Sequence, residues 1–173
     1  MDPVVREPTP EDGPDMGRVH VETWQVAYRG DVPDEYLDAL SADERGRQWA
    51  GAIAGGLGPR RKRFVTDGSD GRVSGLCMCG PANHDGAPET LGEIYLIYVH
   101  PDHWDSGAGR ALMVAGLDFL RSAGFTEAVL WVLPTNDRAR RFYERGGWVE
   151  DGVTRVEEIL DLEVPETRYS IVL

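Results

Sequence analysis

The chain of 173 residues contains little cysteine and no long hydrophobic run. Its two cysteines, Cys77 and Cys79, are too few for a disulfide framework or a four-cysteine zinc site, and their place in a predicted strand indicates packing. No segment approaches the roughly 20 apolar residues that a membrane helix needs. Residues 1–15 are acidic and proline-rich, unlike a secretory signal or a transit peptide. The sequence therefore predicts a protein of a reducing, cytoplasmic compartment with no membrane partner.

Positive charge is also scarce. Lysine and arginine number 18 against 30 aspartates and glutamates, which gives a net charge of −12. This balance argues against a general nucleic-acid binder, which needs a basic surface. A cationic substrate would be attracted, although acidity of this size is also typical of simple solubility. The hydrophobic share of 41% and the charged share of 28% are ordinary for a globular protein, and the length fits one domain.

Helix-like and strand-like segments alternate along the chain. A first helix is predicted to start between Pro10 and Asp15 and to end near Gly30. Further helices are predicted over residues 34–40, 42–53, 107–123 and 136–145. Strands are predicted over residues 63–67, 72–80, 94–99, 127–133, 148–153 and 168–173. This order predicts an α/β fold: a mixed central β-sheet with helices on both faces and a strand–helix–strand crossover.

The segment from Val99 to Leu112 carries the most informative pattern. A predicted strand ends at Val99, and Gly107-x-Gly109 opens a predicted helix. Glycines have no side chains to cover the start of the helix, so its free N–H groups and its positive end would face outward and suit a pyrophosphate. The alternative is that Gly-x-Gly forms only a tight turn, as it more often does. The pattern is neither a P-loop nor a dinucleotide fingerprint, because the required lysine and third glycine are absent. Residues 100–105 have a metal-like composition, yet they flank this loop and a proline, and we expect no metal there.

Two polar side chains share one face of the last predicted helix. Asn136 and Tyr143 are seven residues apart, about two helical turns, with the small Ala139 between them. Phe142 can point into the core. Two interpretations stay open: Asn136 is only a helix cap and Tyr143 is half-buried, or an amide and a phenol line a site.

Glu93 stands beside the strongly apolar strand 94–99. A carboxylate at the end of a central strand is costly to bury unless it is partnered or wet. Glu93 is therefore either solvated in a loop or a general base with a raised pKa. Residues 150–166 contain seven acidic residues against one basic residue, which could attract a cationic substrate.

Together these segments resemble the GNAT family of acyl-CoA-dependent N-acetyltransferases. The resemblance covers nearly the whole chain and is strongest over residues 93–148, where strand, Gly-x-Gly loop, helix, strand and the Asn…Phe-Tyr…Gly-Trp helix follow in family order. Residues 21–30 and 33–41 also look like a common bacterial branch of that family. Two positions depart from the family pattern Gln/Arg-x-x-Gly-x-Gly/Ala: Trp104 occupies the Gln/Arg position, and Asp105 stands where glycine is frequent.

The resemblance implies a single GNAT domain over residues 1–173. Within it, residues 1–90 would form the acceptor side, residues 91–150 the acyl-CoA-binding core and residues 151–173 the C-terminal strands. It also implies acetyl-CoA as cosubstrate, no metal, and direct attack of an amine on the thioester. A homodimer is compatible with the family.

The resemblance also implies a role for individual residues. Glu93 would relay the amine proton through water, and Tyr143 would protonate the departing thiolate. The backbone of Val99 would pair with the pantetheine arm, which Asn136 would contact. The implied cofactor-binding residues are Val99, Trp104, Asp105, Ser106, Gly107, Ala108, Gly109, Arg110 and Asn136.

Two functions stay open at this level. The first is N-acetyltransfer to a primary amine of a small molecule or peptide, favoured by Glu93 together with Tyr143. The second is a catalytically weak acyl-CoA-binding sensor or interaction domain, favoured by Trp104 together with Asp105. Three aromatic residues belong either to the core or to the wall of an acceptor pocket: Trp24, Tyr28 and Tyr36.

Overall fold

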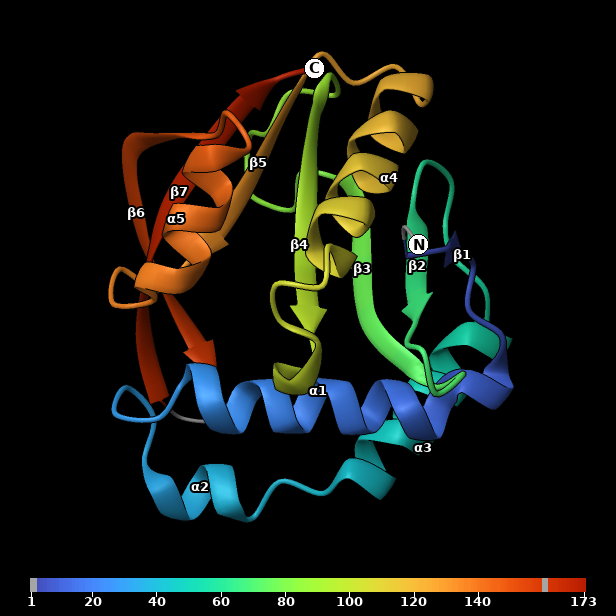
Figure 1. Cartoon of the computed structure of the whole chain (residues 1–173). Coiled ribbons are helices and arrows are strands. Elements are labelled where there is room, and N and C mark those ends of the chain that lie inside the picture. Colours follow the sequence, from blue (N-terminus) through green and yellow to red (C-terminus); the bar gives the residue numbers. More distant parts are fainter. Residues whose placement is uncertain (1–2, 160–161) are drawn as a thin grey trace.

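A computed structural model describes residues 3–159 and 162–173 (Figure 1). A seven-stranded mixed sheet has the order β1-β2-β3-β4-β5-β7-β6. The strands are β1 (Val5–Arg6), β2 (Lys62–Asp67), β3 (Val73–Pro81), β4 (Leu91–Val99), β5 (Glu127–Val132), β6 (Val149–Ile159) and β7 (Leu162–Val172). The helices are α1 (Gly13–Ala27), α2 (Asp34–Asp38), α3 (Ala42–Ala54), α4 (Ala108–Ser122) and α5 (Asp137–Arg145), with 3-10 turns η1 (Pro10–Asp12) and η2 (Pro101–His103). The predicted α/β class is confirmed.

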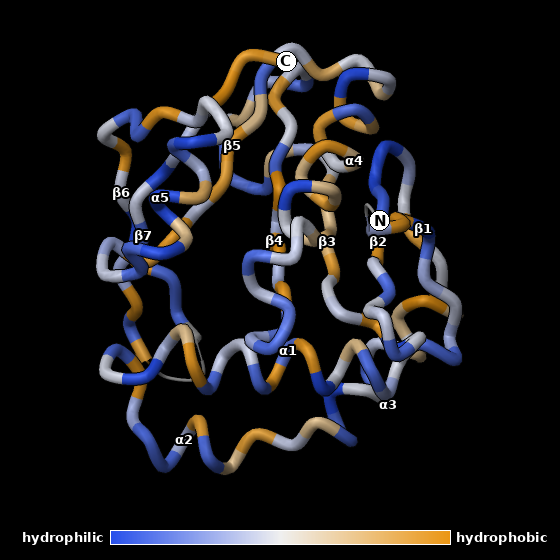
Figure 2. The backbone as a smooth tube through the Cα atoms, viewed as in Figure 1, coloured by the Kyte–Doolittle hydropathy of each residue, from blue (hydrophilic) through white to orange (hydrophobic). Residues whose placement is uncertain are grey.

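Two hydrophobic clusters cover the two faces of the sheet. Leu76 on β3 packs with residues of α1 and α3, whereas its neighbour Cys77 packs with residues of α4. Successive side chains of a strand point to opposite faces, so β3 supplies both clusters. Cys77 and Cys79 are fully buried, which confirms their packing role. Figure 2 shows hydrophobic colour along β5 and parts of β3, β4 and α4, while much of α5 is hydrophilic.

Helix α4 lies within the predicted range of residues 107–123. Leu112, Leu117 and Leu120 are buried against the sheet. Gly124 has a φ of +88°, the left-handed conformation that glycine commonly supplies after a helix end. In the described part of the chain, every helix is too short or too polar to cross a membrane.

Strands β4 and β5 are parallel neighbours that soon separate. They pair only along Leu91–Glu93 and Glu127–Val129. The register between β3 and β4 shifts between Met78 and Cys79, so that Tyr95 is the extra residue on β4. Such a bulge bends a strand and increases its twist. Beyond Glu93 the two strands spread apart, and Figure 1 shows them opening like a V toward α1.

The C-terminal strands are longer than predicted. Strands β6 and β7 form an antiparallel hairpin instead of short strands over 148–153 and 168–173. Strand β6 lies at the edge of the sheet, and most of its described side chains are exposed and many are charged. Hydrophobic alternation therefore does not reveal the full length of these strands. The two-residue strand β1 was also not predicted.

Candidate active site

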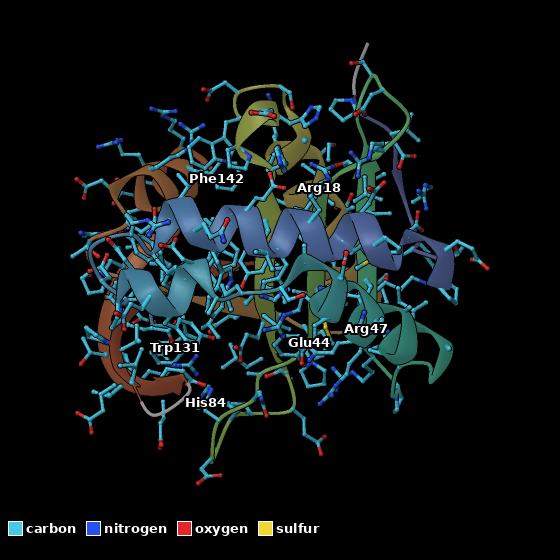
Figure 3. All side chains as sticks on the ribbon, turned by 90° about the horizontal axis from the view of Figure 1, so that it is seen from below. Arg18, Glu44, Arg47, His84, Trp131 and Phe142 are labelled. Carbon is cyan, nitrogen blue, oxygen red and sulfur yellow. The ribbon has the colours of Figure 1, made fainter. Side chains whose placement is uncertain are left out.

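A cleft of about 1090 Å³ opens where β4 and β5 diverge. Its walls come from these two strands, from α4 and α5 on one side, and from α1, β6 and β7 on the other. In Figure 3, seen from below, Phe142 and Trp131 lie on opposite sides of α1 although both line the cleft. The cleft therefore connects two faces of the sheet, and two ligands entering from opposite sides can meet between the strands.

The edge of β4 that borders the cleft has backbone groups directed away from β3. The N–H of His100 donates to the carbonyl of Ser74 at 2.8 Å. Hydrogen-bonded and non-hydrogen-bonded pairs alternate in an antiparallel ladder, so the N–H and C=O of Val99 and Ile97 turn toward the cleft. The Val99 carbonyl accepts the indole N–H of Trp104 at 2.8 Å. The carbonyl is thus already used, and the N–H of Val99 remains available to donate a hydrogen bond to a ligand.

The loop before α4 ends in a glycine that caps the helix. Gly107 is the N-cap residue with a φ of +90°, and Asp105 also has a positive φ of +61°. These left-handed conformations turn the chain sharply into the helix. In the part of the chain that the structure describes, four N–H groups at this turn have no hydrogen-bond acceptor: those of Asp105, Gly107, Gly109 and Arg110.

Trp104 and Asp105 join this loop to its neighbours. Besides its bond to Val99, the Trp104 indole lies under the guanidinium of Arg138 on α5, 4.1 Å from ring centroid to carbon. Arg138 also contacts Asp105 at 3.2 Å, so that the aspartate charge next to the helix start has a partner. The two departures from the family pattern thus connect β4, the loop and α5.

Asn136 and Tyr143 both line the cleft, as their shared helix face predicts. The side-chain oxygen of Asn136 accepts the N–H of Ala139 at 3.1 Å, so Asn136 is also the helix cap. Tyr143 is buried to 8% exposure, and its ring packs edge-on against Trp148. Among the described residues its hydroxyl has no hydrogen-bond partner, and burial raises the pKa of Tyr143 well above its ordinary value of 10.

Glu93 is buried, with 5% exposure, on β4 next to the point where the strands separate. Its Oε2 accepts the backbone N–H of Asn83 at 2.9 Å. Burial raises the pKa of Glu93, and this hydrogen bond opposes the shift. Glu93 itself does not line the cleft, whereas the next residue, Ile94, does.

The three predicted acceptor-side aromatic residues are not together. Trp24 and Tyr28 stack on α1, with ring centroids 4.6 Å apart, and both line the cleft. Tyr36 instead lines a separate cavity of about 360 Å³ between α1, α2 and α3, where its buried hydroxyl has no hydrogen-bond partner among the described residues. Only the α1 pair is placed to contact a ligand in the main cleft.

Sequence analysis missed several residues of the cleft, four of which contact one another. These four are Trp131 on β5, Arg155 and Glu157 on β6, and Glu166 on β7. The only signal, the acidic bias of residues 150–166, covered Arg155, Glu157 and Glu166 but not Trp131. Which of these carboxylates face the cleft depends on the pairing of β6 with β7, which that bias does not reveal.

Residues 100–105, whose composition resembles that of a metal site, form hydrogen bonds that hold the loop. His100 is buried, and its Nε2 lies 2.6 Å from Glu22 Oε2. Its Nδ1 accepts the N–H of Asp102 at 3.2 Å. No group of three or more His, Cys, Asp or Glu side chains able to hold a metal ion occurs among the described residues.

Comparison with known proteins gives a consistent result. Residues 20–148 match the sequence profile described as the acetyltransferase (GNAT) family. The chain is 33% identical over 132 residues to the uncharacterized N-acetyltransferase YuaI of Bacillus subtilis strain 168, which covers 76% of this chain and 72% of that protein. It is 40% identical over 133 residues to a mycothiol acetyltransferase of Acidimicrobium ferrooxidans, covering 77% of this chain but only 39% of the relative.

Solved structures share the fold. The PaiA N-acetyltransferase of Thermoplasma acidophilum, solved in complex with coenzyme A, superposes with a TM-score of 0.72 over 100% of both chains at 17% identity. YncA of Salmonella typhimurium, solved with acetyl-CoA, superposes with a TM-score of 0.70 over 99% of this chain and 94% of that one at 19% identity.

Proposed function

Because the chain belongs to the GNAT family of N-acetyltransferases, we propose that it transfers an acetyl group from acetyl-CoA to a primary amine of a small molecule or peptide. The observation that carries this proposal is the cleft between β4 and β5, which opens on both faces of the sheet. Cosubstrate and amine would enter from opposite sides and meet between the strands. No nucleophile of the enzyme is then required, because positioning alone makes the reaction intramolecular.

The residues at the start of α4 suit the pyrophosphate of acetyl-CoA. The free N–H groups of Gly107, Gly109 and Arg110 lie at the positive end of a 15-residue helix. A Cβ on Gly109 would lie 3.5 Å from Phe142 and 3.6 Å from Val99, so a larger side chain would enter the cleft. The N–H of Val99, which has no acceptor among the described residues, would hold the pantetheine arm or polarise the thioester carbonyl. Acetyl-CoA supplies the activated acetyl thioester.

Tyr143 is the proposed general acid. It lines the cleft, and its hydroxyl is not committed to another group in the described chain. Since burial raises its pKa, the hydroxyl keeps its proton at neutral pH and can give it to the departing thiolate.

Glu93 is the proposed base. Freeing a lysine-like amine of its proton at pH 7 costs roughly 4–5 kcal/mol, so a proton acceptor near the amine is valuable. The raised pKa of Glu93 suits this task. Because its carboxylate lies behind the cleft wall, the proton must reach it through water. The first proton of the ammonium goes through water to Glu93, and the neutral amine nitrogen then bonds to the acetyl carbon while the carbon–sulfur bond breaks. Tyr143 gives its proton to the departing sulfur, and the second amine proton, released as the amide forms, returns through solvent to the Tyr143 oxygen.

Two measurements test this function. Isothermal calorimetry should detect acetyl-CoA binding, and release of free thiol should follow on addition of an accepting amine. Gly109→Leu should abolish binding, whereas Gly109→Ala, whose Cβ makes ordinary contacts, should retain it. Binding without turnover over a broad amine panel would favour a sensor, and unchanged affinity in folded Gly109→Leu would remove this loop from the cofactor site.

A further inference from the structure

An arginine already fills an aromatic and acidic corner of the cleft. The guanidinium of Arg155 lies over the Trp131 ring, 4.2 Å from its centroid. Its Nε donates to Glu166 Oε2 at 2.7 Å, and its Nη2 lies 3.4 Å from Glu157 Oε2. All four residues line the cleft on the side of α1 and the β6–β7 hairpin. We call them the cation corner.

The cation corner has one positive charge for two carboxylates. Glu166 is 12% exposed at its side chain, and no donor in the described residues reaches its Oε1. The nearby Arg168 lies 5.8 Å from the Trp131 ring but pairs with Asp151 at 2.8 Å. The corner therefore holds an excess of negative charge in a half-buried place, where a second cation would be bound favourably.

The cation corner is poorly suited to bind the amine that reacts. An amine must be neutral to attack a thioester, whereas a neighbouring carboxylate favours the protonated ammonium. A carboxylate beside an indole face suits a cation that stays charged, as Arg155 itself demonstrates. The corner is thus complementary to a second positive group on the same substrate.

We propose that the acceptor carries, besides its reacting amine, a separate cationic group that binds in the cation corner against Glu166 and Trp131. Glu166 is then a specificity-determining residue, and Arg155 is an internal cation that shares or yields the corner when substrate binds. This inference rests on the proposed acetyltransferase function and specifies the substrate class of the same cleft.

Matched probes test the charge requirement. Each carries one primary amine at one end of an alkyl spacer and differs only at the other end: a guanidinium, a hydroxyl or a carboxylate. Spacers of several lengths are compared, by thiol release with acetyl-CoA and by calorimetry in the presence of CoA. We expect the aminoalkyl guanidine to exceed the amino alcohol in kcat/KM and in affinity by roughly tenfold or more at its best spacer length.

Three variants assign the preference. Glu166→Gln should reduce the guanidine-to-alcohol ratio toward one and leave acetyl-CoA affinity unchanged. Glu163→Gln removes the same charge from an exposed place on β7 and should leave the ratio as in wild type. Arg155→Gln should change affinity in the opposite direction, tightening the guanidine probe, because both carboxylates of the corner lose their internal partner.

The outcomes separate the two proposals. Acetyl-CoA binding with equal use of the three probes, a preference for the carboxylate, or a ratio untouched by Glu166→Gln would overturn the inference alone. So would weaker binding of the guanidine by a folded Arg155→Gln, since that indicates a purely structural arginine. Absence of both acetyl-CoA binding and turnover with every amine would instead refute the proposed function.

Discussion

Replacing Tyr143 with phenylalanine removes one hydroxyl from the wall of the cleft and little else. The ring stays packed against Phe142, Trp148 and Tyr169, at centroid distances of 5.5, 6.4 and 6.1 Å. No group in the described chain hydrogen-bonds to the lost hydroxyl. The substitution therefore leaves no buried donor or acceptor unpaired, which is the usual reason for a large loss of stability.

The expected magnitudes differ for catalysis and for folding. Loss of a proton donor used only in the transition state should lower kcat by roughly 10–10³-fold, equal to about 1.4–4 kcal/mol. The free energy of unfolding should change by less than about 1 kcal/mol. Since burial holds the pKa of Tyr143 above 10, the hydroxyl is protonated throughout the assay range, and the acidic limb of the pH profile should not move.

Tyr169 offers a matched control in the same aromatic group. Its hydroxyl accepts from Arg140 Nε at 3.0 Å and donates to Glu144 Oε1 at 2.9 Å. Tyr169→Phe should therefore cost roughly 1–2 kcal/mol of unfolding free energy, a fall in Tm of about 2–8 °C, while kcat stays near wild type.

The assay is steady-state thiol release at saturating acetyl-CoA and amine, with Tm from thermal denaturation and acetyl-CoA affinity from calorimetry. The reasoning predicts opposite patterns in the two variants: lost kcat with unchanged Tm, then lowered Tm with unchanged kcat. A Tyr143→Phe enzyme with wild-type kcat would exclude Tyr143 as the acid and leave water in that role.

Three further expectations follow from individual positions. Glu93 must be deprotonated to accept a proton, so log(kcat/KM) should rise with pH through its raised pKa and then level off; Glu93→Gln should abolish that limb and cost roughly 10²-fold, and an unchanged profile would assign the base elsewhere. Gly17→Ala would place a Cβ 2.3 Å from the carbonyl oxygen of Ala42 and push α1 from α3, costing roughly 1–3 kcal/mol in denaturant unfolding, while Gly51→Ala, with open space around it, should be neutral or stabilising. Asp105→Asn removes an exposed negative charge beside the helix start and should tighten acetyl-CoA binding severalfold, an effect that high salt diminishes; equal affinity in low salt would contradict it.

Local patterns predicted the parts of the site that lie within one segment. The strand–loop–helix around Gly107 and the shared face of Asn136 and Tyr143 follow from short periodicities, and both are found where expected. For Asn136 the two interpretations proved compatible, because the same side chain caps α5 and lines the cleft. For Glu93 the sequence left a solvated loop residue and a base with a raised pKa both open, and the structure shows the side chain buried.

Contacts between distant segments were beyond those patterns. Tyr36 is near Tyr28 in sequence but faces another cavity, because the chain between α1 and α2 turns it away. Trp104 departs from the family pattern, yet its indole bonds to Val99 and lies under a guanidinium of α5. Nothing in a linear sequence shows that Glu166 enters the cleft, since its direction is set by the register between β6 and β7.

The sequence by itself determined the order of the main helices and strands, the strand–loop–helix around Gly107 and the polar face of α5, because side-chain periodicity and glycine conformations act over a few residues. Only the tertiary structure decided where the cleft forms. The bulge at Tyr95 and the short pairing of β4 with β5 separate two neighbouring strands, and this gap brings α1, α5 and the C-terminal hairpin to one cleft. Strand pairing depends on contacts between residues far apart in sequence, so the cleft and its cation corner exist only once the whole sheet is assembled.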